Sequence, residues 1–139
     1  MDRKLVERVV EHEGIRQFPY KDTRGFITIG IGRNLTTKGL SKDECYNLLT
    51  NDLIACNFQL LTVPAYISLD KIRKDVLIEL CFNLGFVGLR KFKKMWSAIE
   101  QKDYNEAQKQ LRDSLWAKQV GQSRVDDICY RMVNGAYRT

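Results

Sequence analysis

The chain has 139 residues, of which 44% are hydrophobic and 29% charged, with a net charge of +6. These values fit one domain, or two small lobes, around a packed core, and they exclude a chain that is disordered throughout. The positive charge favours a polyanionic partner, which leaves nucleic acid, an anionic membrane surface and the bacterial cell wall as alternatives.

Residues 1–17 carry charges throughout and contain no apolar stretch of the kind found in secretory signals. No run of residues approaches the length of a membrane span. We therefore expect a product made in the cytoplasm, without stable membrane insertion.

The four cysteines show no metal-type pairing such as C-x-x-C, and His12 is the only histidine. A zinc site is therefore not predicted. The apolar neighbours of Cys81 and Cys129 favour an interpretation of the four thiols as small buried core residues, with a disulfide as the alternative.

Residues 3–13 form the first predicted helix, because apolar side chains recur on one face and Gly14 follows as a stop signal. Residues 18–36 change to β-formers interrupted by glycines, which predicts a small antiparallel sheet with a turn at 21–25.

Ser41 and Glu44 form a capping box that opens a long helix reaching about residue 61. Pro64 breaks this pattern. Further helices are predicted from Ser68 or Asp70 to about Gly85, and over 90–101, 103–113, 114–119 and 123–134.

This order of elements predicts an α+β fold, with the sheet in one region and helices in the rest. We expect a small N-terminal lobe at about 13–40, a bridging helix at about 41–61, and a helical C-terminal lobe at about 62–139 that packs with helix 1–12. A cleft between the lobes is the natural place for a substrate.

Glu13, Asp22 and Thr28 are the candidate catalytic residues. A helix end, a turn and a strand deliver two carboxylates and a hydroxyl, and glycosidic hydrolysis needs one acid together with one ionised carboxylate. The alternative, that Glu13 complements the helix and Asp22 serves only the turn, has equal weight on pattern alone.

The string from Glu13-Gly14 through Tyr20-Lys21-Asp22-Thr23 to the glycine-rich segment 25–32 closely resembles the lysozymes of T-even bacteriophages and related phage endolysins. Eight residues separate the Glu from the Asp and five separate the Asp from the Thr, as in that family. Looser similarity covers nearly the whole chain, including Phe82-Asn83-Leu84-Gly85, Trp116 and the segment from Ser123-Arg124 to Tyr137.

The resemblance implies a single lysozyme-like domain, α+β in class, in which Glu13 is the general acid and Asp22 assists the attacking water near Thr28. Arg124 matches an arginine that pairs with the catalytic Glu. Burial favours the protonated form that an acid catalyst needs, whereas a nearby cation favours the ionised form, so we expect burial to prevail at Glu13.

Three features depart from the family pattern. Arg33 replaces a histidine, and we expect it to pair with Asp52 on the bridging helix. Asn34 replaces an apolar cleft residue and, with Phe82 and Arg124, is a candidate substrate-binding residue. The segment between Thr36 and Ser41 is shorter than in the family, which predicts a missing rim of the cleft.

Other candidates have plainer interpretations. His12 points away from Glu13 on the helix and is expected at the surface or at a lobe contact. Trp96 and Trp116 are expected in the core rather than stacked on sugar. The basic run 90–94 is expected to be a solvated helix face that can also attract an anionic polymer.

The resemblance implies an N-acetylmuramidase that hydrolyses bacterial peptidoglycan with inversion, without a metal or organic cofactor, as a monomer. It would be made in the host cytoplasm and would reach the wall through a holin pore. The alternatives are a lytic transglycosylase, which needs only one acid, and a basic non-catalytic protein that disrupts wall or membrane. A nucleic-acid binder is disfavoured, because acidic residues interrupt the basic ones.

Overall fold

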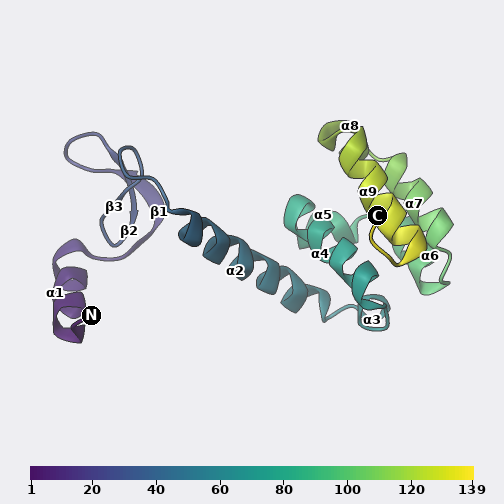
Figure 1. Cartoon of the computed structure of the whole chain (residues 1–139), viewed down its shortest axis with the longest axis horizontal. Helices are drawn as coiled ribbons and strands as arrows, with labels where there is room; N and C mark the ends of the chain where they lie inside the picture. Colours follow the sequence, from purple (N-terminus) through teal and green to yellow (C-terminus); the bar gives the residue numbers. More distant parts are fainter. The chain divides into compact units, whose positions relative to one another are not determined.

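The computed structural model describes all 139 residues and resolves into two units, Met1–Leu48 and Leu49–Thr139 (Figure 1). The first unit begins with α1 (Arg3–Glu13), where the Asp2 side chain accepts a hydrogen bond from the amide of Lys4. The helix ends at Gly14, whose φ of 73° suits glycine and whose amide donates to the carbonyl of Val10. The predicted helix is confirmed, and it places Glu13 at its last position.

A three-stranded antiparallel sheet follows, in the order β1 (Arg16–Lys21), β2 (Ile27–Gly30) and β3 (Arg33–Asn34). Thr28 pairs with Tyr20 on β1 and with Asn34 on β3, so these three side chains share one face of the sheet. The central position of β2 explains why Thr28 is buried. The sheet predicted within 18–36 is confirmed and begins two residues earlier.

The long helix α2 (Lys42–Leu60) has the predicted capping box. The Ser41 hydroxyl accepts from the amide of Glu44, and the Glu44 carboxylate accepts from the amide of Ser41. The boundary between the two units falls within this helix, after Leu48.

The second unit is entirely helical. Its elements after α2 are α3 (Pro64–Ile67), α4 (Lys71–Leu84), α5 (Phe86–Arg90), α6 (Lys93–Glu100), α7 (Tyr104–Arg112), α8 (Leu115–Val120) and α9 (Gln122–Asn134). The Asp70 and Asp103 side chains cap α4 and α7, as their positions predicted. The short helices α3 and α5 were not predicted: Pro64 opens α3 at its first position, where a missing amide hydrogen costs nothing.

One hydrophobic core joins α4, α6, α7, α8 and α9. Trp96 and Trp116 are buried in it, as expected, and each indole has a hydrogen-bond acceptor: the carbonyl of Leu89 for Trp96 and the side chain of Asn83 for Trp116. No helix is both long enough and apolar enough to cross a lipid bilayer.

All four cysteines are free. Three are buried, and burial raises the pKa of the Cys81 thiol to about 12 and also raises that of Cys129. The expectation of buried thiols is wrong for Cys45, which is exposed. Cys45 is the fourth residue of α2, in a part of that helix that contributes no residue to the core.

Candidate functional site

Asp22 and Thr28 belong to one hydrogen-bonded network centred on Phe26. One carboxylate oxygen of Asp22, Oδ1, accepts from the amides of Arg24 at 2.8 Å and Phe26 at 2.9 Å. The carbonyl of Phe26 accepts in turn from the amide of Asp22 at 2.9 Å and from the Thr28 hydroxyl at 3.2 Å. The turn therefore fixes Asp22 through one oxygen and leaves the second oxygen outside the network.

Both interpretations of Asp22 thus agree with its geometry. Oδ1 fulfils the turn role that short polar side chains commonly take, while the other oxygen has no partner in the protein. The Thr28 hydroxyl donates its hydrogen to Phe26 and keeps its lone pairs as acceptors. A carboxylate oxygen and a fixed hydroxyl can together orient a water molecule.

Glu13 lies against Gly32, in the turn between β2 and β3. A Cβ atom built at position 32 would stand 2.8 Å from Glu13 Oε2 and 2.9 Å from its Cδ, which is closer than real Cβ contacts come. The φ of Gly32, 69°, also lies in the region that favours glycine. Glycine at this position therefore leaves the space that the Glu13 carboxylate occupies.

The two carboxylates are associated with opposite ends of β2. Asp22 belongs to the turn before Ile27, and the Glu13 carboxylate lies beside Gly32, after the strand ends at Gly30. The turn before β2 and the turn after it thus each present one carboxylate of the N-terminal unit.

The Glu13 side chain is exposed within the N-terminal unit. We expected Glu13 to be buried and to pair with Arg124. Arg124 belongs to the other unit, so both expectations stay predictions. His12, beside it on α1, is exposed. No group of three or more His, Cys, Asp or Glu side chains is arranged to hold a metal ion.

Asn34 supports the turn after β3. Its side-chain oxygen accepts from the amide of Thr37 at 3.1 Å, and its carbonyl accepts from the amide of Lys38. Asn34 also lies opposite Thr28, on the same face of the sheet. That position keeps it a candidate for substrate contact.

The prediction that Arg33 pairs with Asp52 is wrong. Arg33 makes two short contacts with Glu44, at 2.6 and 2.7 Å, and also donates to the carbonyl of Gly39. Glu44 and Asp52 are eight residues, or ~12 Å, apart along α2, so one guanidinium cannot serve both. The hydrogen bond from Arg33, reinforced by the Ser41 amide, lowers the pKa of Glu44 from 4.5 to about 2.

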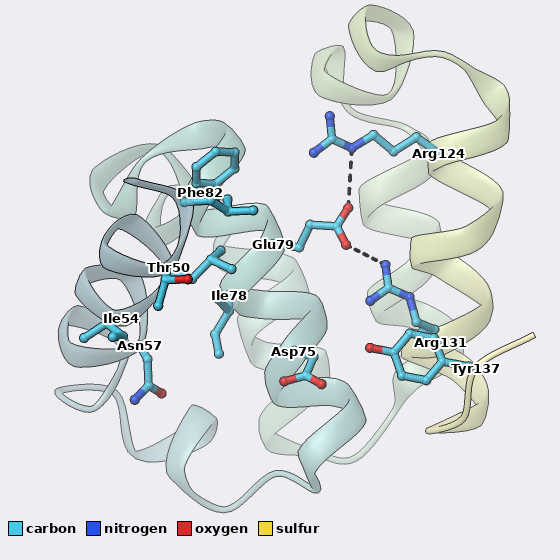
Figure 2. Close-up of a pocket in the computed structure, with 12 residues that line it drawn as sticks. Thr50, Ile54, Asn57, Asp75, Ile78, Glu79, Phe82, Arg124, Arg131 and Tyr137 are labelled. Atoms are coloured by element: carbon cyan, nitrogen blue, oxygen red, sulfur yellow. Dashed lines mark hydrogen bonds and ion pairs between the residues drawn. The ribbon is translucent and has the colours of Figure 1, made fainter. Parts of the chain in front are cut away.

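Phe82 and Arg124 line one hollow of about 650 Å³ in the C-terminal unit (Figure 2). Its apolar wall comes from α2 and α4, with Ile54 and Ile78 among the lining side chains. Phe82 is 44% exposed at this wall. The structure therefore brings together two of the three predicted substrate-binding residues.

Sequence reasoning missed Glu79, which holds Arg124 at the edge of this hollow. The Glu79 carboxylate contacts Arg124 at 3.5 Å and Arg131 at 2.7 Å, as the dashed lines in Figure 2 show. Arg131 is only 4% exposed and also pairs with Asp127 at 2.8 Å. Nothing in the spacing of Glu79 distinguished it from the other acidic residues of the chain.

Comparison with known proteins agrees with the sequence motif. The model of the phage lysozyme family matches residues 10–132, which is most of the chain and includes all the candidate residues. Probable T4-type lysozyme 2 of Dictyostelium discoideum is 31% identical over 153 residues, covering 86% of this chain and 88% of the relative.

Two further relatives are similar at lower identity. Probable T4-type lysozyme 1 of Dictyostelium discoideum is 28% identical over 138 residues, covering 78% of this chain and 81% of the relative. The pre-baseplate central spike protein Gp5 of Enterobacteria phage T4 is 28% identical over 145 residues, covering 84% of this chain but 25% of that protein. The chain belongs to the phage lysozyme family, and it is a glycoside hydrolase of the lysozyme type.

Proposed function

We propose that this lysozyme is an N-acetylmuramidase that hydrolyses the β-1,4 bond between N-acetylmuramic acid and N-acetylglucosamine in peptidoglycan. The observation that carries the proposal is the placement of two carboxylates at opposite ends of β2: Asp22 is held by backbone amides of its turn, and Glu13 lies beside Gly32. Glycosidic hydrolysis needs such a pair, with one group as acid and the other as base or stabiliser.

Glu13 is the general acid in this proposal, because its carboxylate forms no ion pair with a cation of the same unit. It gives its proton to the leaving glycosidic oxygen as the bond to the anomeric carbon breaks. Burial by bound substrate favours the protonated form that this step requires.

Asp22 and Thr28 direct the attacking water. The free oxygen of Asp22 accepts a proton from the water, whose oxygen forms the new bond to the anomeric carbon from the opposite face, while the Thr28 oxygen orients it. In this proposal the reaction proceeds with inversion, as the resemblance to the T-even phage lysozymes implies.

Asn34, Phe82 and Arg124 are the proposed substrate-binding residues. Asn34 shares a sheet face with Thr28 and offers an amide to sugar hydroxyls. Phe82 presents a half-exposed ring suited to stacking on a sugar, and Arg124 offers guanidinium nitrogens beyond the one that meets Glu79.

The biological setting that we propose is lysis of a bacterial host by a monomeric enzyme. The enzyme would accumulate in the host cytoplasm and reach the cell wall after a holin permeabilises the membrane. Purified enzyme should therefore lyse permeabilised cells and leave intact cells unharmed, which a turbidity assay on both preparations measures.

The central experiment compares wild type, Glu13→Gln and Asp22→Asn on purified peptidoglycan, with products identified by mass spectrometry. Both variants keep the side-chain size, and asparagine still offers the oxygen that accepts from the Arg24 and Phe26 amides. We expect reducing-end muropeptides from wild type and losses of at least ~100-fold in both variants.

The outcomes separate the rival functions. Anhydro-sugar products together with an active Asp22→Asn variant would indicate a lytic transglycosylase, which needs only one acid. Full activity in Glu13→Gln would overturn the catalytic assignment and favour wall disruption without hydrolysis. The anomeric form of the first product, read by nuclear magnetic resonance, decides between inversion and retention.

A further inference from the structure

The junction between α5 and α6 forms a basic patch that the proposed catalytic residues do not explain. We define this patch as Arg90, Lys91, Lys93 and Lys94, four cations within five consecutive residues. All four side chains are exposed, and none of them forms an ion pair, whereas Arg33, Arg73, Arg112 and Arg131 each pair with a carboxylate. No acidic residue stands in the first turn of α6 to offset the charge.

The patch borders two hollows of the C-terminal unit. Lys91, Lys93 and Lys94 line a hollow of about 400 Å³ that is also lined by Gln110, Asp113 and Ser114. Arg90 and Lys93 line a second hollow of about 290 Å³ beside Trp96. Lys93 belongs to both, so the cations follow a continuous surface.

The charge balance of these hollows favours an anion. The larger hollow has three lysines against the single carboxylate of Asp113, and the smaller one has two cations against the single carboxylate of Glu100. Neither carboxylate lies within ion-pair distance of a patch cation. Unpaired like charges repel each other, and an anion with several charges relieves this repulsion best.

The apolar side chains within this segment do not project outward. Met95 and Trp96 are buried, and Phe92 is half-buried and packs on the core. A surface that inserts into a membrane presents exposed aromatic or aliphatic anchors beside its cations. The patch itself offers charge without such anchors, which favours a hydrated polyanion over a lipid surface.

We propose that the basic patch binds a phosphodiester polymer attached to the bacterial cell wall and thereby retains the enzyme on its substrate. This inference rests on the proposed action on peptidoglycan, since it takes the wall to be the surface on which the enzyme works. Repeated phosphates along one polymer can contact several of the four cations at once, whereas a single carboxylate would meet only one or two.

The test measures sedimentation with purified walls that carry a glycerol-phosphate polymer and with the same walls after hydrofluoric acid has removed it. The patch variant carries Arg90→Gln, Lys91→Gln, Lys93→Gln and Lys94→Gln. The matched control carries Lys4→Gln, Lys38→Gln, Lys109→Gln and Lys118→Gln, which removes the same charge from four exposed, unpaired and scattered lysines. All proteins also carry Glu13→Gln, so that the walls stay intact during the measurement.

We expect the patch variant to bind polymer-bearing walls roughly tenfold or more weakly than the parent at low salt, and the control to lose much less. The difference should vanish on stripped walls and at about 1 M salt, where the Debye length is ~3 Å. Free glycerol-phosphate polymer should compete with the parent for the walls.

Three results would overturn the inference. They are equal losses in the patch variant and the control, parent binding that is unchanged by stripping the walls, or stronger patch-dependent binding to anionic phospholipid vesicles than to polymer-bearing walls. Circular dichroism confirms that each variant is folded before binding is measured. Failure of the proposed function would appear separately, as digestion of the walls by the Glu13→Gln parent.

Discussion

Replacing Gly32 with alanine should displace the Glu13 carboxylate while costing only modest stability. The new Cβ would stand 2.8 Å from Glu13 Oε2, so the carboxylate must move. The end of a glutamate side chain rotates easily, and this displacement itself costs little. The main cost comes from the φ of 69°, which an L-residue adopts at about 1–2 kcal/mol.

Gly30→Ala is the matched control, because Gly30 has nearly the same φ, 70°, and nothing lies within 4 Å of its Cβ position. Both variants should lose about 1–2 kcal/mol in the free energy of unfolding, measured by urea titration. Only Gly32→Ala should also lose hydrolysis, by about 100-fold, since a catalytic group displaced by ~1 Å can lose that much rate.

The assay is hydrolysis of purified peptidoglycan per folded molecule, at a temperature where all three proteins are folded. If Gly32→Ala and Gly30→Ala retained equal activity, Glu13 would not act from the position beside Gly32. If Gly32→Ala were far less stable than Gly30→Ala, the Glu13 side chain would be too constrained to move, and the activity comparison would no longer isolate position.

Three further predictions concern the stability of each unit. Glu44→Gln should weaken the dependence of stability on pH. The pKa of Glu44 is about 2 in the folded protein, so the stabilisation from its pair with Arg33 is fully present above about pH 4.5 and is lost as the pH falls towards 2. The difference in unfolding free energy between wild type and variant should therefore be larger at pH 7 than at pH 3. Arg131→Leu should destabilise the protein by about 2–3 kcal/mol in urea unfolding, because it removes the cation that pairs with the half-exposed carboxylates of Glu79 and Asp127. An unchanged midpoint of unfolding would refute this. Trp116→Phe should cost about 1–2 kcal/mol through the lost 2.7 Å hydrogen bond to Asn83, and a double-mutant cycle with Asn83→Ala measures the coupling directly.

The sequence allowed the local elements to be predicted well, because their signals are themselves local. The Ser41 and Glu44 capping box and the glycine stop after Glu13 each act within four residues, and the structure contains both. The β-formers and glycines of residues 18–36 also predicted Asp22 in a turn and Thr28 in a strand. The Phe26 carbonyl that links these two residues was not predicted, since backbone geometry has no signature in residue type.

The ion-pair partners of the arginines could not be predicted from the sequence. Two acidic residues of α2, Glu44 and Asp52, were possible partners of Arg33. The orientation of the sheet against the start of α2 selects Glu44. Arg124 was identified as a functional cation, yet its nearest carboxylate within the C-terminal unit, Glu79, lies 45 positions earlier in the chain. Both pairs depend on packing between elements that are distant in sequence or differ in type.

The uneven burial of the four cysteines has a practical consequence for handling this protein. A maleimide or iodoacetamide reagent needs an accessible thiolate, and only Cys45 is exposed while burial raises the pKa of Cys81 and Cys129. The native chain should therefore take a single fluorophore or spin label near the start of α2 without any cysteine being replaced. The same thiol makes covalent dimers the expected product of storage without a reductant.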